Sequence, residues 1–417
     1  MAGRPDVVIT GLGALTPAGP DAASTVEAVL AARPAAGPIT AWDAADQAVP
    51  FAASVPDFDP TPWVDPRQAR RIDRVALFAI AAAEEALAQA GLLVAPGEAP
   101  AVDPARVAVV IGTGVGGITS LEDQIAVRVE RGPARVSPLL IPMMMANAAA
   151  GLVALRHGFS GPSFCVSTAC ASGANSIGEG VELIRSGRVD VVVAGGAEAS
   201  ITPTAMAAFA RMGALSRRVD DPATASRPFD RGRDGFVMGE GAGILVLESA
   251  DHAERRGARS LGRVAGHAAT CDAHHITAPD PDGNAAVACM QLALDDAGIA
   301  PGAVGHVNAH GTSTPLNDAA EAAALAKVFG ATGPAVTSTK GVTGHLVGAA
   351  GAVEAVLALA AATTGTVAPV ANLVDPDVDP SVDLVIGVPR QIAPAPVLSN
   401  SFGFGGHNAS LVLAPPG

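Results

Sequence analysis

Short runs of β-branched apolar residues alternate along the chain with alanine-rich stretches whose apolar positions recur at helical spacing. In the first half this pattern predicts a long helix over 71–90 and buried strands over 6–10, 106–112, 189–199 and 243–249. We expect Gly11 and Gly13 to end the first of these strands. Strands that alternate with helices predict βαβ units and a largely parallel, buried sheet.

The same rhythm begins again after a charged stretch at 251–259. Here we expect strands over 261–270, 305–311 and 335–341, helices over 284–298, 318–329 and 346–363, and two final strands joined by a glycine loop within 397–414. The repetition predicts two duplicated halves, residues 1–255 and 256–417. Because no linker-like composition separates them, we expect one compact unit.

Composition narrows the class of protein. Of 417 residues, 49% are hydrophobic and 16% are charged, which provides a large core and excludes a disordered chain. The net charge of −14 argues against binding to nucleic acid. The longest apolar stretch, 348–363, contains Glu354 and is shorter than the ~20 residues of a membrane span. The chain start has no signal-peptide core, so we predict a cytoplasmic protein without a membrane partner.

Cys170 is the candidate nucleophile. It lies in TACASG, between a β-like run at 163–166 and a helical stretch, so we expect it at a helix N-terminus that favours the thiolate. Its small neighbours leave room for a substrate. The alternative is an inert, buried cysteine, which is the interpretation that we give to Cys165, Cys271 and Cys289.

Two histidines occupy matching positions in the second half. His310 follows a predicted strand in NAHGTSTPLND, and His345 follows another in STKGVTGHLVGAAGAVE. We expect His345 at the start of a helix. A helix N-terminus disfavours the positively charged imidazolium, so His345 should stay neutral and donate a hydrogen bond. Two imidazoles beside a thiol suit the stabilisation of a developing oxyanion or enolate. Either histidine alone would usually be a structural residue, but two at matching positions beside a candidate nucleophile favour a catalytic role.

Together with DVVITGLGALTPAG, RPFDRGRDGFVMGEGAG and NSFGFGGHN, these motifs resemble the elongating β-ketoacyl-[acyl carrier protein] synthases of type I/II over almost the whole chain. The resemblance implies the five-layer αβαβα arrangement of the thiolase superfamily, in the α/β class. It also implies decarboxylative Claisen condensation of malonyl carrier protein with an acyl group on Cys170. The N-terminal half would carry this nucleophile, and the C-terminal half would carry both histidines and a gating loop.

The same resemblance implies roles for individual residues. His310 and His345 would hold the malonyl thioester carbonyl while CO2 leaves, and Lys340 and Glu354 would orient the His345 loop. The backbone N–H groups of Cys170 and Phe404 would form the oxyanion hole. The other implied roles are a gate made by Phe402, Gly403, Phe404, Gly405 and Asp272, and substrate contacts from Val115, Leu140, Thr277, Thr312 and Thr314. His407 departs from the Thr or Asn that many relatives have at its position.

The resemblance also implies the partners. No bound cofactor is expected, because the substrates travel on the phosphopantetheine arm of an acyl carrier protein. Arg67, Arg70 and Arg71 form a candidate docking patch for that acidic protein, although a solvated helix start explains them nearly as well. The chain would act as a homodimer, or as a heterodimer with a chain-length-factor homologue. Both fatty-acid and type II polyketide synthesis fit, and TACASG resembles the fatty-acid type more.

Several competing functions make distinct demands on the sequence. A thiolase needs a second catalytic cysteine in a C-terminal glycine loop, and no cysteine follows Cys289. An initiating synthase has Asn in place of His345, and a chain-length-determining subunit lacks the nucleophilic cysteine. An inert subunit that binds the carrier protein stays open as an alternative. We expect no metal site, because Cys271, His274 and His275 have no suitably spaced fourth ligand.

Overall fold

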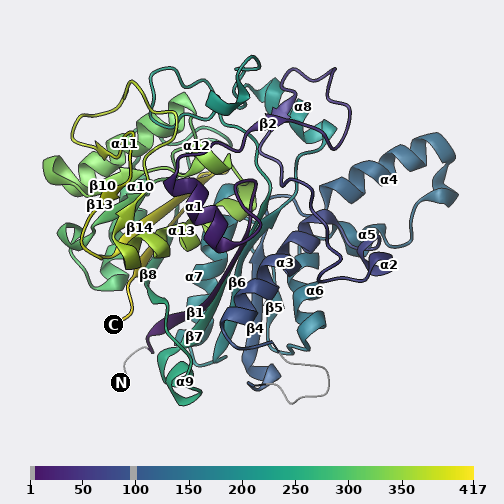
Figure 1. The fold of residues 1–417 in the computed structure, drawn as a ribbon, viewed down its shortest axis with the longest axis horizontal. Coiled ribbons are helices and arrows are strands. Elements are labelled where there is room, and N and C mark those ends of the chain that lie inside the picture. The colour runs from purple at the N-terminus through teal and green to yellow at the C-terminus, as the bar shows by residue number, and fades with distance from the viewer. Residues whose placement is uncertain (1–4, 94–100) are drawn as a thin grey trace.

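The computed structural model describes residues 5–93 and 101–417, and an 11-stranded mixed sheet extends through the molecule (Figure 1). The strands, from one edge to the other, are β12 (Asp383–Leu384), β10 (Ala335–Thr337), β9 (His306–Asn308), β14 (Val397–Gly403), β15 (His407–Ala414), β8 (Gly262–Cys271), β1 (Val7–Leu15), β7 (Gly241–Ser249), β6 (Val191–Glu198), β4 (Val107–Gly112) and β5 (Ser163–Phe164).

The prediction of a largely parallel sheet is wrong. Every pair that includes β1, β7, β8 or β15 is antiparallel, and the remaining pairs are parallel.

The sheet consists of two half-sheets with the same topology. The first has the order β5–β4–β6–β7–β1, and the second repeats this order and these directions as β10–β9–β14–β15–β8. Among the described residues, the strands of the two half-sheets pair with each other at Val8 and Ile9 of β1 and Arg263 and Gly262 of β8. This repeat is what a duplication produces, while the exact boundary between residues 255 and 256 stays a prediction.

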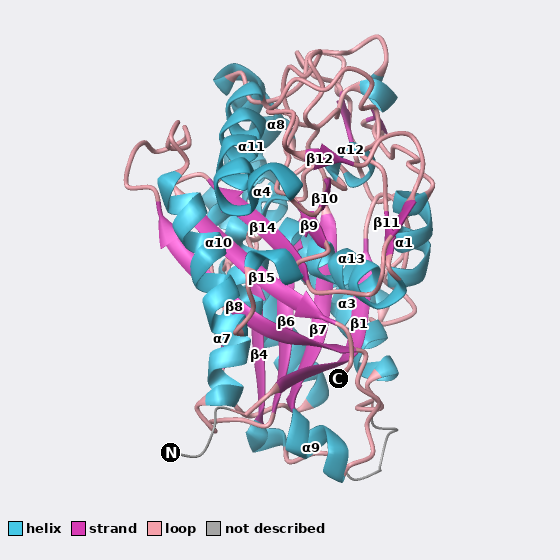
Figure 2. Ribbon diagram, turned by 90° about the vertical axis from the view of Figure 1, so that its left-hand side faces the viewer, coloured by secondary structure: helices cyan, strands magenta, loops and turns pink. Residues whose placement is uncertain are grey.

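Helices cover both half-sheets and also lie between them. The central layer consists of α7 (Ser172–Arg185) and α13 (Ala350–Thr364). The outer layers are α3 (Arg74–Gln89) with α6 (Ala148–His157) on the first half-sheet, and α10 (Asn284–Ala297) with α11 (Pro315–Phe329) on the second. This αβαβα order is visible in Figure 1, and Figure 2 shows the strands fanning across the molecule. The predicted fold class is confirmed.

The remaining elements lie mainly around the edges of these layers. The helices are α1 (Ala22–Leu30), α2 (Pro66–Ala69), α4 (Ile118–Arg131), α5 (Leu140–Met144), α8 (Pro203–Met212), α9 (Ala250–Arg255) and α12 (Lys340–Thr343). Two short ladders pair β2 (Gly37–Pro38) with β3 (Phe51–Ala52) and β11 (Thr366–Val367) with β13 (Arg390–Gln391).

The central helix α13 explains the most apolar part of the sequence. The stretch Val347–Thr364 is long and apolar enough to cross a bilayer, but 83% of it is buried inside the protein. Both faces of α13 meet a half-sheet, so this helix needs apolar residues on every side. Its composition is therefore that of a core helix.

Two glycines in β1 have a different role from the predicted one. The strand continues through Gly11 and Gly13 instead of stopping there. A Cβ atom on either glycine would lie 2.0 Å from a backbone carbonyl oxygen of α3, that of Ala86 or Ala82. These glycines therefore allow α3 to pack directly on the strand. The helix itself begins at Arg74, later than predicted, because the Asp73 side chain caps it by accepting the N–H of Val75.

Candidate active site

Cys170 lies on the strand-to-helix turn that the sequence predicts. After β5, the chain forms a 3₁₀ turn over Ala169–Ala171 and continues directly into α7. Ala169 has a φ of 50°, in the left-handed region that residues with a Cβ seldom adopt. The turn leaves Cys170 only 9% exposed, in the wall of a cavity.

The side chain of Cys170 is a thiol rather than the expected thiolate. Burial raises its pKa to about 12, and this effect outweighs the lowering by Lys340 and by the backbone N–H groups of Phe404 and of Cys170 itself. Removing a sulfur anion from water costs more here than Lys340 and the two backbone N–H groups return. The predicted thiolate is therefore wrong, although the two N–H groups expected in the oxyanion hole both lie at the sulfur.

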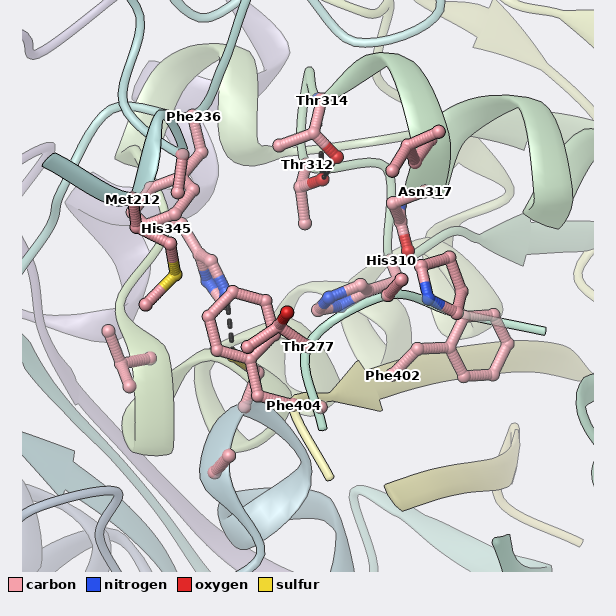
Figure 3. Close-up of a pocket in the computed structure, with 18 of the residues that line it drawn as sticks. Met212, Phe236, Thr277, His310, Thr312, Thr314, Asn317, His345, Phe402 and Phe404 are labelled. Carbon is pink, nitrogen blue, oxygen red and sulfur yellow. Dashed lines mark hydrogen bonds between the residues drawn. The ribbon is translucent and has the colours of Figure 1, made fainter. Parts of the chain in front are cut away.

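His310, His345 and Cys170 line the same cavity. Figure 3 shows the two imidazole rings in it. Nε2 of His345 lies 3.0 Å from Sγ of Cys170. The ring centroids of the two histidines are 5.3 Å apart, at an interplanar angle of 85°. Burial, reinforced by the positive charge of Lys340, holds the pKa of both imidazoles well below the usual value. Both rings are therefore neutral, as predicted for His345, but burial and not a helix N-terminus is the main cause.

Lys340 and Glu354 form a buried pair beneath the histidines. Nζ of Lys340 donates a hydrogen bond of 2.6 Å to the carbonyl oxygen of His310 and pairs with the carboxylate of Glu354. Burial raises the pKa of Glu354 to about 7, although Lys340 opposes the shift. The sequence assigns this pair to the His345 loop, but the direct contact of Lys340 is with the backbone at His310.

Two buried carboxylates that the sequence analysis did not identify support this site. Glu321 on α11 accepts hydrogen bonds from the backbone N–H of His310 at 2.8 Å and of Gly311 at 2.7 Å. Burial raises the pKa of Glu321 to about 7. Glu198, at the end of β6, accepts from the backbone N–H of Gly114 and Gly348 at 2.7 and 3.1 Å. The sequence does contain one indication of this role: Glu321 is a charged residue on the buried face of the helix that directly follows HGTST.

The cavity has a volume of about 490 Å³ and collects most of the predicted substrate and gate residues. Besides Cys170 and the histidines, the predicted residues in its wall are Val115, Asp272, Thr277, Thr312, Thr314, Phe402, Gly403 and Phe404. The hydroxyls of Thr312 and Thr314 lie 2.9 Å apart. Gly405 and Leu140 are not in this wall. Phe209, Met212, Phe236 and Asn317 also line it, and the sequence analysis did not identify them.

Two loops at the cavity, at 271–280 and at the glycine-rich segment 403–408, are bonded to each other. Asp272 accepts a hydrogen bond of 2.6 Å from the Asn408 side chain, and the N–H of Gly405 donates to the Ile276 carbonyl at 2.7 Å. Gly406 has a φ of 75°, and a Cβ there would lie 2.9 Å from the Cβ of Asp272. Glycine at 406 therefore permits the loops at 271–280 and 403–408 to lie in contact.

Other predicted residues lie away from the cavity. Arg67, Arg70 and Arg71 are exposed on α2 and the turn that follows it, and Leu140 is half-buried on α5. Their roles stay predictions.

The structure corrects part of the interpretation of the other cysteines. Cys289 is buried as predicted, but Cys165 is half-buried and Cys271 is exposed. Within residues 5–93 and 101–417, no group of three or more His, Cys, Asp or Glu side chains could hold a metal ion. The alternative of a metal site at Cys271, His274 and His275 therefore has no support.

Comparison with known proteins identifies what this geometry resembles. The family models "Beta-ketoacyl synthase, N-terminal domain" and "Beta-ketoacyl synthase, C-terminal domain" match residues 4–253 and 261–374. The 3-oxoacyl-[acyl-carrier-protein] synthase 2 of Synechocystis is 47% identical over 409 residues, which cover 98% of this chain and 97% of that protein. Among solved structures, the ishigamide ketosynthase/chain length factor has a TM-score of 0.92 at 34% identity, with full coverage of both chains. A type II polyketide ketosynthase, bound to a hexaketide and in complex with its acyl-carrier protein (AntDE:AntF), has a TM-score of 0.89 at 30% identity, again over 100% of both chains.

Proposed function

The chain belongs to the β-ketoacyl synthase family, and from that premise we propose that Cys170, His310 and His345 carry out its condensation reaction. The reaction joins an enzyme-bound acyl thioester to malonyl-[acyl carrier protein] with loss of CO2. One observation carries the assignment of residues. A thiol and two neutral imidazoles, from three separate segments, share one buried cavity with 3.0 Å between Sγ of Cys170 and Nε2 of His345.

The first step loads the acyl group. Sγ of Cys170 attacks the thioester carbonyl of the acyl carrier protein, and Nε2 of His345 accepts the thiol proton as the S–C bond forms. The C–S bond to the carrier breaks, and the departing sulfur takes that proton. The backbone N–H groups of Cys170 and Phe404 lie at the reacting sulfur and would stabilise the tetrahedral oxyanion.

The second step forms the carbon–carbon bond. In this step His345 is in its other neutral tautomer, with the proton on Nε2, and the N–H groups of His310 and His345 donate hydrogen bonds to the malonyl thioester carbonyl while the C–C bond to the carboxylate breaks to release CO2. The electron pair remains as an enolate, which attacks the acyl carbon on Cys170. The C–S bond breaks, and the sulfur takes up a proton from the solvent to return to the thiol. A lysine fixed on the carbonyl of His310 keeps one donor in place during these steps.

We further propose that the acyl chain belongs to fatty-acid synthesis and that the acyl carrier protein delivers both substrates on its phosphopantetheine arm. The identity to the Synechocystis 3-oxoacyl-[acyl-carrier-protein] synthase 2 is 47%, against 34% for the ishigamide ketosynthase/chain length factor and 30% for the type II polyketide ketosynthase. A homodimer is the assembly that goes with this pathway. A heterodimer with a chain-length-factor homologue would go with polyketide synthesis.

Mass spectrometry of the chain after incubation with a panel of acyl carrier proteins tests the function and the pathway together. We expect a saturated acyl group to be added at Cys170, no addition in Cys170→Ala, and normal addition in Cys289→Ala, whose thiol is buried outside the cavity. A folded chain that accepts no acyl group would instead favour the inert, carrier-binding subunit. Preferential loading of polyketide intermediates would overturn the proposed pathway but not the chemistry.

A further inference from the structure

A second, smaller cavity lies beneath the strand ends that lead to His310 and Lys340. Its volume is about 120 Å³, and its wall shares no residue with that of the active-site cavity. One side is polar and is formed by His306 and Asn308 on β9, Thr337 on β10 and Thr339 just before α12. The opposite side is apolar and comes from α1 and α13, including Val29, Leu357 and Ala361. The side chains of Thr364 and Thr366 stand at its more exposed end.

The polar side contains a concentration of unused hydrogen-bonding atoms. Five atoms have no partner among residues 5–93 and 101–417: Nδ1 and Nε2 of His306, Oδ1 of Asn308, Oγ1 of Thr337 and Oγ1 of Thr339. The four side chains are between 1% and 4% exposed. A buried polar atom without a partner costs about 1–3 kcal/mol, so five together in one wall require an explanation.

The register of the sheet places these atoms together. Asn308 and Thr337 are paired across the parallel strands β9 and β10, and His306 is two residues before Asn308 on the same face. The polar row is therefore continuous along the cavity wall. Burial lowers the pKa of His306 to about 3, so its ring is neutral and offers one donor and one acceptor.

We propose that this cavity is a binding site for a small cluster of water molecules, held by His306, Asn308, Thr337 and Thr339. Every polar group in the cluster is neutral, and each is a hydrogen-bond donor, an acceptor or both, which matches water and not a charged ligand. One water needs only about 10–15 Å³ of such space, so a cavity of about 120 Å³ accommodates several. The waters complete the hydrogen bonding at the ends of β9 and β10. They thereby stabilise the strand ends from which the His310 and Lys340 segments begin.

An isosteric substitution distinguishes a hydrated cavity from a dry one. In Thr337→Val the shape is kept and the hydroxyl is lost. With water bound, the variant removes a partner from the cluster, and we expect the melting temperature to fall by about 1–3 °C. In a dry cavity the same change removes an unsatisfied hydroxyl, so the melting temperature would stay the same or rise, and the proposal would be wrong. Thr25→Val provides the reference, because its buried hydroxyl is satisfied by the Asp21 carbonyl at 2.8 Å.

A crystal structure of the full chain at high resolution gives a second, independent test that needs no variant. We expect ordered water density within about 3.2 Å of a nitrogen of His306 and of Oγ1 of Thr337. Featureless density in a well-ordered cavity would overturn the proposal, as would side chains that have closed the cavity and bonded to one another. Neither outcome would bear on the condensation reaction, because none of the four side chains lines the active-site cavity.

Discussion

Nε2 of His345 lies 3.0 Å from Sγ of Cys170, although 175 residues separate them in the sequence. Burial raises the pKa of the thiol to about 12 and lowers that of the imidazole, so both groups are neutral in the folded protein. The proton therefore stays on the sulfur until a substrate arrives. Activation of Cys170 then depends on transfer of the thiol proton to His345 while the new S–C bond forms, and not on a preformed thiolate.

This relationship predicts the pH dependence of alkylation at Cys170. Because its thiol pKa is raised, the thiolate fraction is small at neutral pH and grows with every unit of pH. In a Cys271→Ser background, which removes the exposed competing thiol, we expect iodoacetamide to react about tenfold faster for each unit between pH 7 and 9. A rate that is already constant above pH 7 would instead indicate a preformed thiolate.

The two histidines should differ in which step they affect. Only His345 contacts the sulfur, so His345→Ala should slow both acylation of Cys170 and release of CO2 from malonyl carrier protein. His310→Ala should slow CO2 release by about 10²–10⁴-fold and leave acylation largely intact. Single-turnover acylation and CO2 release, measured on the same preparations, separate the two steps. Equal loss of acylation in both variants would contradict the assignment.

The buried pair of Lys340 and Glu354 should be required for stability as well as activity. Lys340→Met leaves the carboxyl group of Glu354 and the carbonyl of His310 in the core without their shared partner, so we expect a loss of about 3–5 kcal/mol in the free energy of unfolding. The double variant Lys340→Met/Glu354→Leu also removes the unpaired carboxyl group and should recover much of that loss without recovering condensation. Arg33→Met, which breaks an exposed pair with Glu27, should cost no more than about 1 kcal/mol. Urea unfolding measures all three, and a loss at Lys340 no larger than at Arg33 would contradict the assignment.

Glu321 should make stability dependent on pH. Its pKa is raised from 4.5 to about 7 in the folded protein, so the folded state binds its proton more tightly than the unfolded chain does. The contribution of Glu321 to the free energy of unfolding is fully present below about pH 4.5 and is lost as the pH rises through 7. Between pH 4.5 and 8, wild type should therefore lose on the order of 3 kcal/mol relative to Glu321→Gln.

Urea unfolding of both proteins across this range measures that difference. Glu130→Gln, at an exposed position on α4, is the control and should follow wild type at every pH. If the difference in the free energy of unfolding between wild type and Glu321→Gln stayed constant over this pH range, the carboxylate would be ionised throughout the range and the prediction would be wrong.

Local patterns in the sequence predicted most of the strands and helices, whereas the layered arrangement was implied by the family resemblance. Alternating apolar runs located the strands and helices, and the motifs around Cys170, His310 and His345 were recognisable from a few adjacent residues. Strand direction was not predictable in this way. The antiparallel pairs of β7 and β15 depend on which strands become neighbours, and that is decided by packing across the whole sheet.

The remaining errors have the same origin. Gly11 and Gly13 look like strand stops until α3 is placed against them. The pKa of Cys170 depends on how deeply the fold buries it, which a helix N-terminus in the sequence does not reveal. Glu321 supports the His310 loop by accepting hydrogen bonds from backbone N–H groups. Every residue except proline has such a group, so the identities of His310 and Gly311 do not indicate that they bind a carboxylate.

Phe404 combines two functions that a single substitution separates. Its backbone N–H lies at the sulfur of Cys170, while its ring is half-buried and lines the cavity (Figure 3). Phe404→Ala keeps the N–H and removes only the ring. We therefore expect the oxyanion hole to survive and the access of the acyl chain to Cys170 to change.

The expected result is a change of at least about tenfold in the rate of acylation by long-chain carrier proteins, with little loss of stability. A gate controls access, so the size of the change should depend on acyl length, whereas damage to the oxyanion hole would slow all acyl groups equally. Phe51→Ala is the matched control, because Phe51 is 2% exposed and lies outside the cavity wall. That variant should lose about 3–5 kcal/mol of stability and keep the length dependence of wild type. If Phe404→Ala acylates every chain length at the wild-type rate, the ring does not control access, and only the backbone at this position contributes to the reaction.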